Sequence, residues 1–136
     1  MCKRCHAHEN PFCSIDQLGL YGTIPSELSR LKELQVLSLL DNAIYGNIPS
    51  EIGSIETMVD IDVHLNDLEG SIPLEFYDLT NLLAFNLGYN KLTGTISPNI
   101  ANMTILKGLH VHENSLSGAI PTEIGALQSS LGEYRS

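Results

Sequence analysis

The stretch that decides the fold runs from Leu106 to Ile124 and reads LKGLHVHENSLSGAIPTEI. Parts of it recur along the chain: Ile-Pro begins at positions 24, 48, 72 and 120, and Ile96-Ser97 fills the remaining slot, so successive isoleucines lie 24 residues apart. Asn recurs on the same step at positions 42, 66, 90 and 114, and Gly at 22, 46, 70, 94 and 118. Residue types that share one period of this length indicate a stacked repeat architecture.

The unit over residues 34–55 shows how each repeat is built. Leu37 and Leu39 flank a polar residue, which is the alternation of a short strand. Asn42 ends the strand, where an amide can bond backbone groups in the turn. Gly46 permits a tight bend, and Pro49 opens a short helical turn, where its missing N–H does no harm. Such a unit can bury its apolar side only by stacking on its neighbours.

The strands of the stack can be placed from the same pattern. We expect four parallel strands near residues 36–39, 60–63, 84–87 and 108–111, with a possible fifth near 12–15. Neighbouring strands should lie ~4.8 Å apart. The fold class is therefore an α/β repeat solenoid, with a parallel sheet on one face and short 3-10 or helical turns on the other.

The full unit, L-x-x-L-x-L-x-x-N-x-L-x-G-x-I-P-x-E-I, resembles the plant-type leucine-rich repeat, and the resemblance covers residues 13 to about 128. It implies a right-handed coil in which the Leu-x-Gly-x-Ile-Pro segment adds a second short strand. It also implies three segments: an N-terminal cap over 1–12, a solenoid over 13–128 with about four full repeats after a degenerate first one, and a short tail over 129–136. Similar repeats form the ectodomains of receptor-like kinases and the polygalacturonase-inhibiting proteins, whose members bind peptides, proteins or glycans on the strand face.

The charge of the chain narrows its partners. The formal net charge is −9, from 16 acidic against 7 basic residues, and no Lys or Arg stands between Lys32 and Lys91. This field repels phosphate backbones, so nucleic acid is a poor partner and a basic protein or peptide a better one. Simple solubility is the alternative reading of the same charge. The sequence has no window of about 18 apolar residues, the length that a membrane-spanning helix needs. Residues 1–6 lack the apolar run of a signal peptide. The resemblance to the repeat family nevertheless implies an extracellular or cell-surface location.

The outward face of the strands holds the candidate binding site, because residues on either side of an inward position point to solvent. The candidate ligand-binding residues are Val36, Ser38, Leu40, Asp60, Asp62, His64, Asn86, Tyr89, His110, His112 and Glu113. His64 and His112 should lean toward a common guest over Gly88, either a basic side chain of a partner or a divalent metal. A solvated face with no guest is the alternative. No Ser on this face has a His on an adjacent strand with an Asp behind it, so we expect neither catalysis nor a cofactor.

Two further features concern modification and metal binding. Cys2, Cys5 and His6 match the c-type haem pattern C-x-x-C-H, and the same residues with His8 and Cys13 could make a small zinc site. The resemblance to the repeat family favours instead a disulfide-stapled cap, with Cys5 paired to Cys13. Asn102 opens an N-x-[ST] sequon and is the expected glycosylation site if the protein is secreted.

The expected function is a non-catalytic binding module of receptor-like or scaffold type that recognises a protein or peptide. A secreted enzyme inhibitor of the polygalacturonase-inhibiting kind is the alternative, and a metal- or haem-carrying protein is a third reading. The last coil adds one expectation. Its apolar lining, including Leu109, Val111, Ile120 and Ile124, should be thinly covered, so self-association or a neighbouring chain is expected at that open end.

Overall fold

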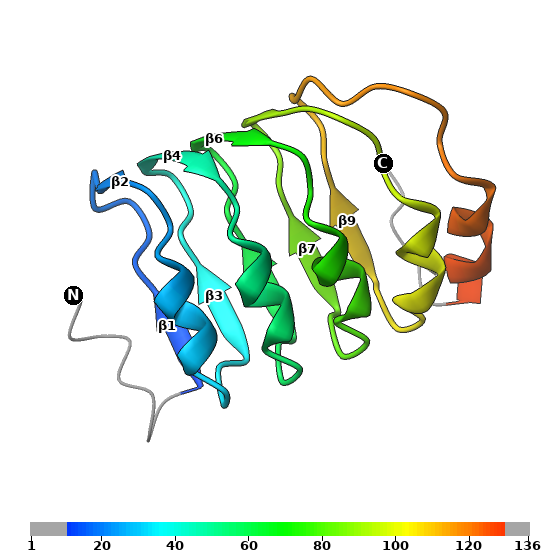
Figure 1. The fold of residues 1–136 in the computed structure, drawn as a ribbon, viewed down its shortest axis with the longest axis horizontal. Coiled ribbons are helices and arrows are strands. Elements are labelled where there is room, and N and C mark those ends of the chain that lie inside the picture. Colours follow the sequence, from blue (N-terminus) through cyan, green and yellow to red (C-terminus); the bar gives the residue numbers. More distant parts are fainter. Residues whose placement is uncertain (1–10, 130–136) are drawn as a thin grey trace.

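The computed structural model describes residues 11–129 and shows them as a stack of similar coils (Figure 1). One side of the stack is a five-stranded parallel sheet in the order β1–β3–β5–β7–β9. Its strands are β1 (Phe12–Ser14), β3 (Val36–Ser38), β5 (Asp60–Asp62), β7 (Ala84–Asn86) and β9 (Gly108–His110). In its register Cys13 pairs with Leu37, and Ile61 with Phe85. The predicted strands are confirmed, each ending one residue earlier than expected.

A second parallel sheet crosses the top of the stack in the order β2–β4–β6–β8. Its strands are β2 (Tyr21–Gly22), β4 (Ala43–Asn47), β6 (Asp67–Gly70) and β8 (Lys91–Leu92). In the unit that ends at Pro49, β4 occupies the segment in which the family resemblance implied a second short strand. Each described coil up to β8 therefore has two extended sides.

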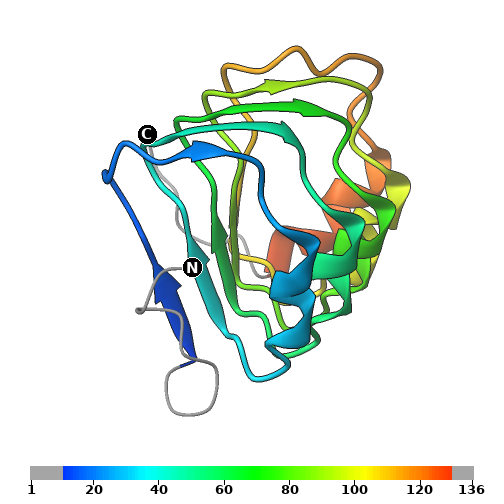
Figure 2. The ribbon, with the colours of Figure 1, turned by 60° about the vertical axis from the view of Figure 1, so that its left-hand side comes forward.

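The remaining side consists of short 3-10 helices, which Figure 2 shows opposite the first sheet. They are η1 (Ser26–Arg30), η2 (Ser50–Ser54), η3 (Leu74–Asp78), η4 (Pro98–Asn102) and η5 (Thr122–Ser129). Pro49 opens η2 as predicted, because its carbonyl accepts the first hydrogen bond of the turn, from the backbone N–H of Ile52 at 3.2 Å. Pro49 is the N-cap, and its extended ψ of 126° ends the connection before η2 begins.

The core lies between the two sheets and the 3-10 helices. Alternate strand residues point into it: Leu37, Ile61 and Phe85 are 1–2% exposed. Phe85 also stacks on Phe76 of η3, with ring centroids 5.5 Å apart. No charged side chain is buried among the described residues, and the hydroxyl of the buried Tyr77 accepts a hydrogen bond from the backbone N–H of Ser97. Apolar packing is therefore the main force that holds the core.

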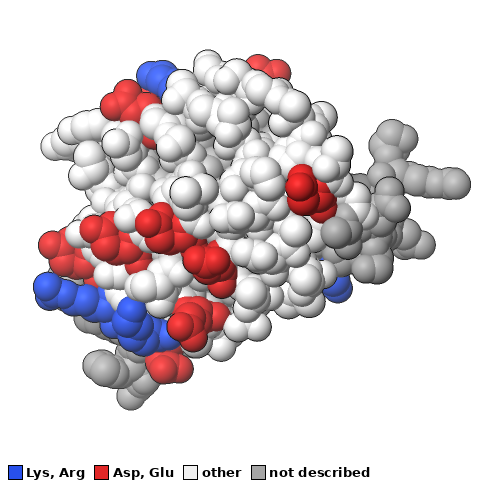
Figure 3. All heavy atoms as spheres, turned by 45° about the vertical axis from the view of Figure 1, so that its right-hand side comes forward, with Lys and Arg blue, Asp and Glu red and all other residues white. Residues whose placement is uncertain are grey.

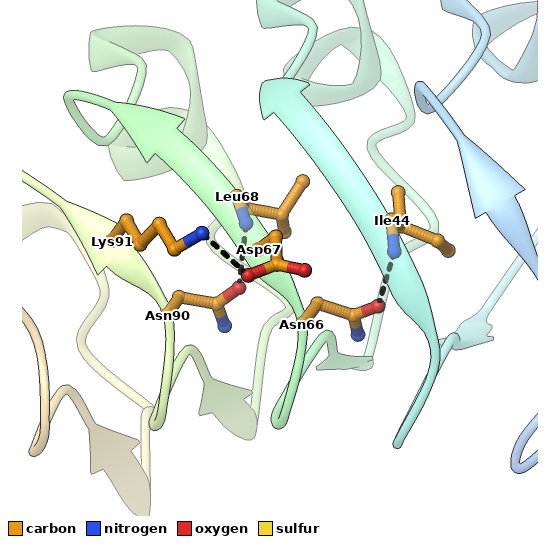
Figure 4. Close-up of polar contacts among 6 residues, drawn as sticks. All are labelled: Ile44, Asn66, Asp67, Leu68, Asn90 and Lys91. Atoms are coloured by element: carbon orange, nitrogen blue, oxygen red, sulfur yellow. Dashed lines mark hydrogen bonds and ion pairs between the residues drawn. The ribbon is translucent and has the colours of Figure 1, made fainter.

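Asparagine side chains join one coil to the next at the turn after each strand. The amide Nδ2 of Asn66 donates to the carbonyl oxygens of Leu39, Val63 and His64, and its Oδ1 accepts from the backbone N–H of Ile44 at 3.0 Å. Asn42, Asn90 and Asn114 make the equivalent bonds in their own coils. Figure 4 shows Asn66 and Asn90 reaching across to the preceding coil, beside the surface ion pair of Lys91 with Asp67. These amides satisfy backbone groups that the short strands leave open.

The last coil is covered less than the coils before it. Leu109, Val111 and Ile124 are half-buried, and Ile120 is 74% exposed. The buried counterparts of the first three in the preceding coil are Phe85, Leu87 and Ile100. The expected thin cover of the last apolar lining is thus present in the described part of the chain. What covers it remains a prediction.

Candidate ligand-binding face

The outer face of the first sheet is built by alternation along each strand. In β3 the inward Leu37 is buried, while Val36 and Ser38 on either side are half-exposed. The same pattern makes Asp60 and Asp62 of β5 face outward. Because parallel strands in register bring equivalent positions side by side, the outward residues form rows across the sheet: Ser38 pairs with Asp62, Asp62 with Asn86, and Asn86 with His110.

Three rings meet in the row that follows the ends of the strands. His64 and His112 have ring centroids 5.8 Å apart, although they come from coils separated by the coil of β7. Tyr89 lies edge-on to both, at 5.1 Å from each. The three rings therefore form one continuous cluster, which we call the ring cluster.

Gly88 lets the two imidazoles approach. A Cβ at this position would stand 2.9 Å from Nδ1 of His64 and 2.8 Å from Cε1 of His112, closer than real Cβ atoms come. Any larger residue would push the rings apart. The position of Tyr89 is set by its backbone, which adopts the left-handed conformation, with a φ of 50°. Leu65 and Glu113 take similar values at the equivalent turns.

The rings of His64 and His112 lie closer together than the strands that carry them. Two strand spacings, about 10 Å, separate those strands, and the imidazoles lean toward each other over Gly88, with centroids 5.8 Å apart. A side chain between them would need contacts of about 3.5–4 Å to each ring. No side chain fits in that gap, so a macromolecular ligand would contact the ring cluster from outside.

Asp62 and the equivalent residue Asn86 are held by local bonds beside the ring cluster. Asp62 accepts a hydrogen bond from the backbone N–H of His64 at 3.0 Å, and Asn86 accepts one from Gly88 at 3.3 Å. Burial raises the pKa of Asp60 above its ordinary range, and the neighbouring Asp62 carboxylate raises it further. Two carboxylates on one strand therefore place negative charge on this face beside the histidines.

The remaining candidate residues lie around this centre. His110 is exposed, with its ring centroid 6.3 Å from that of His112. Glu113 is exposed next to it, whereas Val36 and Leu40 are half-buried on the far side of β5. The structure thus gathers His64, Tyr89, His110 and His112 around Gly88 and keeps the apolar pair apart from them.

Sequence reasoning missed Asp16, which extends the face into the first coil. Its carboxylate accepts hydrogen bonds from the Ser38 hydroxyl at 2.6 Å and from the backbone N–H of Leu40 at 3.0 Å. The sequence did indicate that Asp16 faces outward, because Asp16 lies one repeat before the outward residue Leu40. The degenerate first coil, with Leu18 in the place of Asn, hid it.

The 3-10 side of the molecule has its own acidic surface. Glu27, Glu51 and Glu75 occupy the first turns of η1, η2 and η3, and Figure 3 shows a row of acidic side chains on this surface with basic ones at one end. A shallow hollow of about 450 Å³ between η2 and η3 includes Glu51 and Glu75 in its lining. The negative field is therefore not confined to the strand face, and charge alone does not choose between the two.

The predicted modification sites are placed only in part. Cys13 is buried and disulfide-bonded. Its predicted partner Cys5 lies outside the described residues, as do Cys2, His6 and His8 of the haem and zinc readings. Asn102 is exposed at the end of η4, as a glycosylation site requires. Within residues 11–129, no group of three or more His, Cys, Asp or Glu side chains could hold a metal ion together.

Comparison with known proteins gives one consistent fold. The Leucine Rich Repeat family model matches residues 81–103. No curated protein matches the sequence significantly. The plant peptide hormone receptor RGFR1, solved in complex with RGF2, is 40% identical, with a TM-score of 0.83 over 85% of this chain and 18% of that one.

Two further solved structures show the range of proteins with this fold. The ectodomain of the receptor kinase SOBIR1 from Arabidopsis thaliana is 32% identical, with a TM-score of 0.80 over 84% of this chain and 61% of that one. A plant ice-binding protein is 35% identical, with a TM-score of 0.78 over 84% of this chain and 37% of that one. The chain therefore spans less than two thirds of each of these three structures.

Proposed function

This chain is a leucine-rich-repeat protein of the plant type, and from that premise we propose that it binds a protein or peptide on the outer face of the β1–β3–β5–β7–β9 sheet without catalysing a reaction. The observation that carries the proposal is the concentration of varied polar and aromatic side chains on a rigid sheet. His64, Tyr89 and His112 present rings there, next to Asp60 and Asp62. Aromatic groups at the centre of a face, with charges around them, are the usual composition of a binding surface.

The kind of ligand follows from the charge of this face. Asp60 and Asp62 would attract a basic segment of a protein or peptide and steer its approach. The similar receptor RGFR1 was solved in complex with RGF2, and the similar receptor kinase HAESA with a peptide hormone and the co-receptor SERK1. These relatives support a receptor-like role for the present chain over an intracellular scaffold.

An extracellular or cell-surface location belongs to the same proposal. It is supported by the ectodomains among the similar structures. Within the described residues, no helix is long and apolar enough to cross a membrane. An enzyme inhibitor that uses the same face is the alternative, and it differs in requiring a folded enzyme as its partner.

Selection of peptides from a random display library on the full chain tests the proposal. An enriched peptide should bind the double variant Asp60→Asn/Asp62→Asn at least about tenfold more weakly, which is ~1.4 kcal/mol. The matched control is Glu51→Gln/Glu75→Gln, which removes two exposed carboxylates from the 3-10 side. Peptides that lose affinity with the control and keep it with the strand-face variant would place the binding surface on the 3-10 side instead.

A second candidate function is supported by a different surface. Thr23, Asn47, Ser71 and Thr95 are exposed in a column beside the second sheet, and each side chain lies against a glycine of the following coil. Short polar side chains repeated at the ~4.8 Å spacing of neighbouring strands form a regular exposed column. Because a similar structure is a plant ice-binding protein, inhibition of ice recrystallisation should be measured for the wild type and Thr23→Leu/Thr95→Leu. Equal growth of ice crystals with and without the wild type excludes this candidate.

A further inference from the structure

We propose that His64 and His112 together bind a late first-row divalent cation, Zn²⁺, Ni²⁺ or Cu²⁺, beside Gly88 on the outer face of the sheet. The inference is independent of whether the same face binds a protein or peptide. It rests on three features of the site: an imidazole nitrogen without a partner, the spacing of the two rings, and the charge beside them.

The first feature is the state of His64. Its Nδ1 is buried and has no hydrogen-bond partner among the described residues, which makes it the one buried side-chain nitrogen or oxygen in that part of the chain left unpaired. Leaving a buried polar atom unpaired is unfavourable. An imidazole nitrogen with a free lone pair is also the commonest protein ligand for such cations. A bound cation would use the lone pair that the fold leaves open.

The second feature is the spacing set by Gly88. Nδ1 of His64 and Nε2 of His112 both lie within 3.0 Å of the point where a Cβ on Gly88 would stand, so the two nitrogens border the same small space. The gap of 5.8 Å between ring centroids is too narrow for a side chain. An ion needs only about 2.0–2.1 Å to each nitrogen, a distance that small rotations of the two rings can supply.

The third feature is the charge around the pair. Asp62 lies on the strand of His64, with Asp60 beside it, and both favour a cation over an anion at this position. Tyr89 packs against both imidazoles and limits their movement. Because no third His, Cys, Asp or Glu in the described residues completes the group, water must fill the other positions on the ion.

Titration of the full chain with Zn²⁺, followed by NMR of the histidine ring protons at neutral pH, tests the inference. The N-terminal residues could also bind zinc, so the titration is made in a background carrying Cys2→Ser, His6→Ala and His8→Ala. One equivalent should shift or broaden the ring signals of His64 and His112 together. If Zn²⁺ leaves both signals in place at millimolar concentration, the inference is wrong.

Five single variants show whether the pair of rings is the site. Loss of outer partners alone costs a metal site about 10–100-fold, so His64→Ala and His112→Ala should each weaken binding at least as much, while His110→Ala keeps it. Gly88→Ala retains both ligands but forces the rings apart, and it should also weaken binding. Gly108→Ala is its control, because a Cβ there would meet only Cε1 of His110 at an ordinary 3.8 Å. Equal affinity for Gly88→Ala and Gly108→Ala would overturn the proposed geometry.

Discussion

The side-chain amide of Asn66 forms hydrogen bonds with the backbone of four other residues. It donates to carbonyl groups of its own coil and the preceding one, and it accepts from Ile44. A three-residue strand pairs few backbone groups by itself, so the coil needs such a side chain where the strand ends. The recurrence of Asn was readable in the sequence because this demand returns with every coil.

Replacement of Asn66 by Ala should lower the free energy of unfolding by ~2–4 kcal/mol, since several half-buried backbone groups lose their partner together. Asn81→Ala is the matched control. Asn81 is exposed and makes a single bond, to the carbonyl oxygen of Glu56, so its loss should cost less than about 0.5 kcal/mol. Urea unfolding measures both; equal losses would show that the asparagines do not join the coils.

Asp60 gives the protein a pH dependence of a definite sign. Burial and Asp62 raise the pKa of this carboxyl in the folded state, so its ionised form opposes folding. The penalty is fully present above the raised pKa and disappears as the pH falls below the ordinary value for Asp, about 3.9. Asp60→Asn should therefore raise the urea midpoint at pH 7 and leave it unchanged near pH 3. A gain of equal size at both values would contradict this cause; Glu69→Gln, at an exposed position, is the control.

The sequence predicted which side chains point outward, but not which of them make contact. Strand alternation identified the outward side chains, because it depends only on the backbone period. It could not show that His64 and His112 would meet, since that depends on rotamers and on the space above Gly88. Backbone spacing alone therefore gives the distance between the strands and not the distance between the rings.

The 3-10 helices are packed most tightly where glycine removes a side chain. Gly53 of η2 is buried, and a Cβ there would stand 2.6 Å from Cβ of Glu75 and 2.7 Å from its backbone carbonyl atoms. Backbone cannot move aside as the end of a side chain can. The repeat pattern predicted a turn at this place, but not that two turns would approach so closely, because the equivalent residue is Ser29, Tyr77 or Ala101 in other coils and glycine again at Gly125.

Gly53→Ala should destabilise the fold by ~1–3 kcal/mol, the usual cost of overpacking. Gly125→Ala in η5 is the matched control, since a Cβ there has open space within 4 Å; its stability should change by less than about 0.5 kcal/mol. Thermal or urea unfolding compares the two. A harmless Gly53→Ala would mean that η2 and η3 are not in fixed contact.

At the scale of the whole molecule, each described coil covers its neighbour along the stack, and the last described coil is thinly covered. The repeat predicted this from the sequence, because every coil depends on the next one for cover. Ile120 is the most exposed of the apolar residues there, and it borders a shallow hollow of about 310 Å³ that Val111 and Leu116 also line. The sequence could not show what covers this surface, because a partner leaves no trace in the period of the repeat.

Exposed apolar surface at the last coil should promote self-association and bind a hydrophobic dye. Ile120→Ser should reduce both, with little change in stability, because the side chain is already 74% exposed. Sedimentation velocity over a range of concentrations, with dye fluorescence alongside, measures the effect. A protein that stays monomeric and binds no dye before the substitution would contradict the prediction.

The central claim is that the outer face of the first sheet binds the ligand, and the position of a bound peptide tests it most directly. Amide chemical shifts of the isotope-labelled chain should be recorded with and without a peptide selected from the display library. We predict that the largest changes fall in residues 60–64, 84–89 and 108–113. Changes concentrated instead in η1, η2 and η3, with the strand face undisturbed, would contradict the claim.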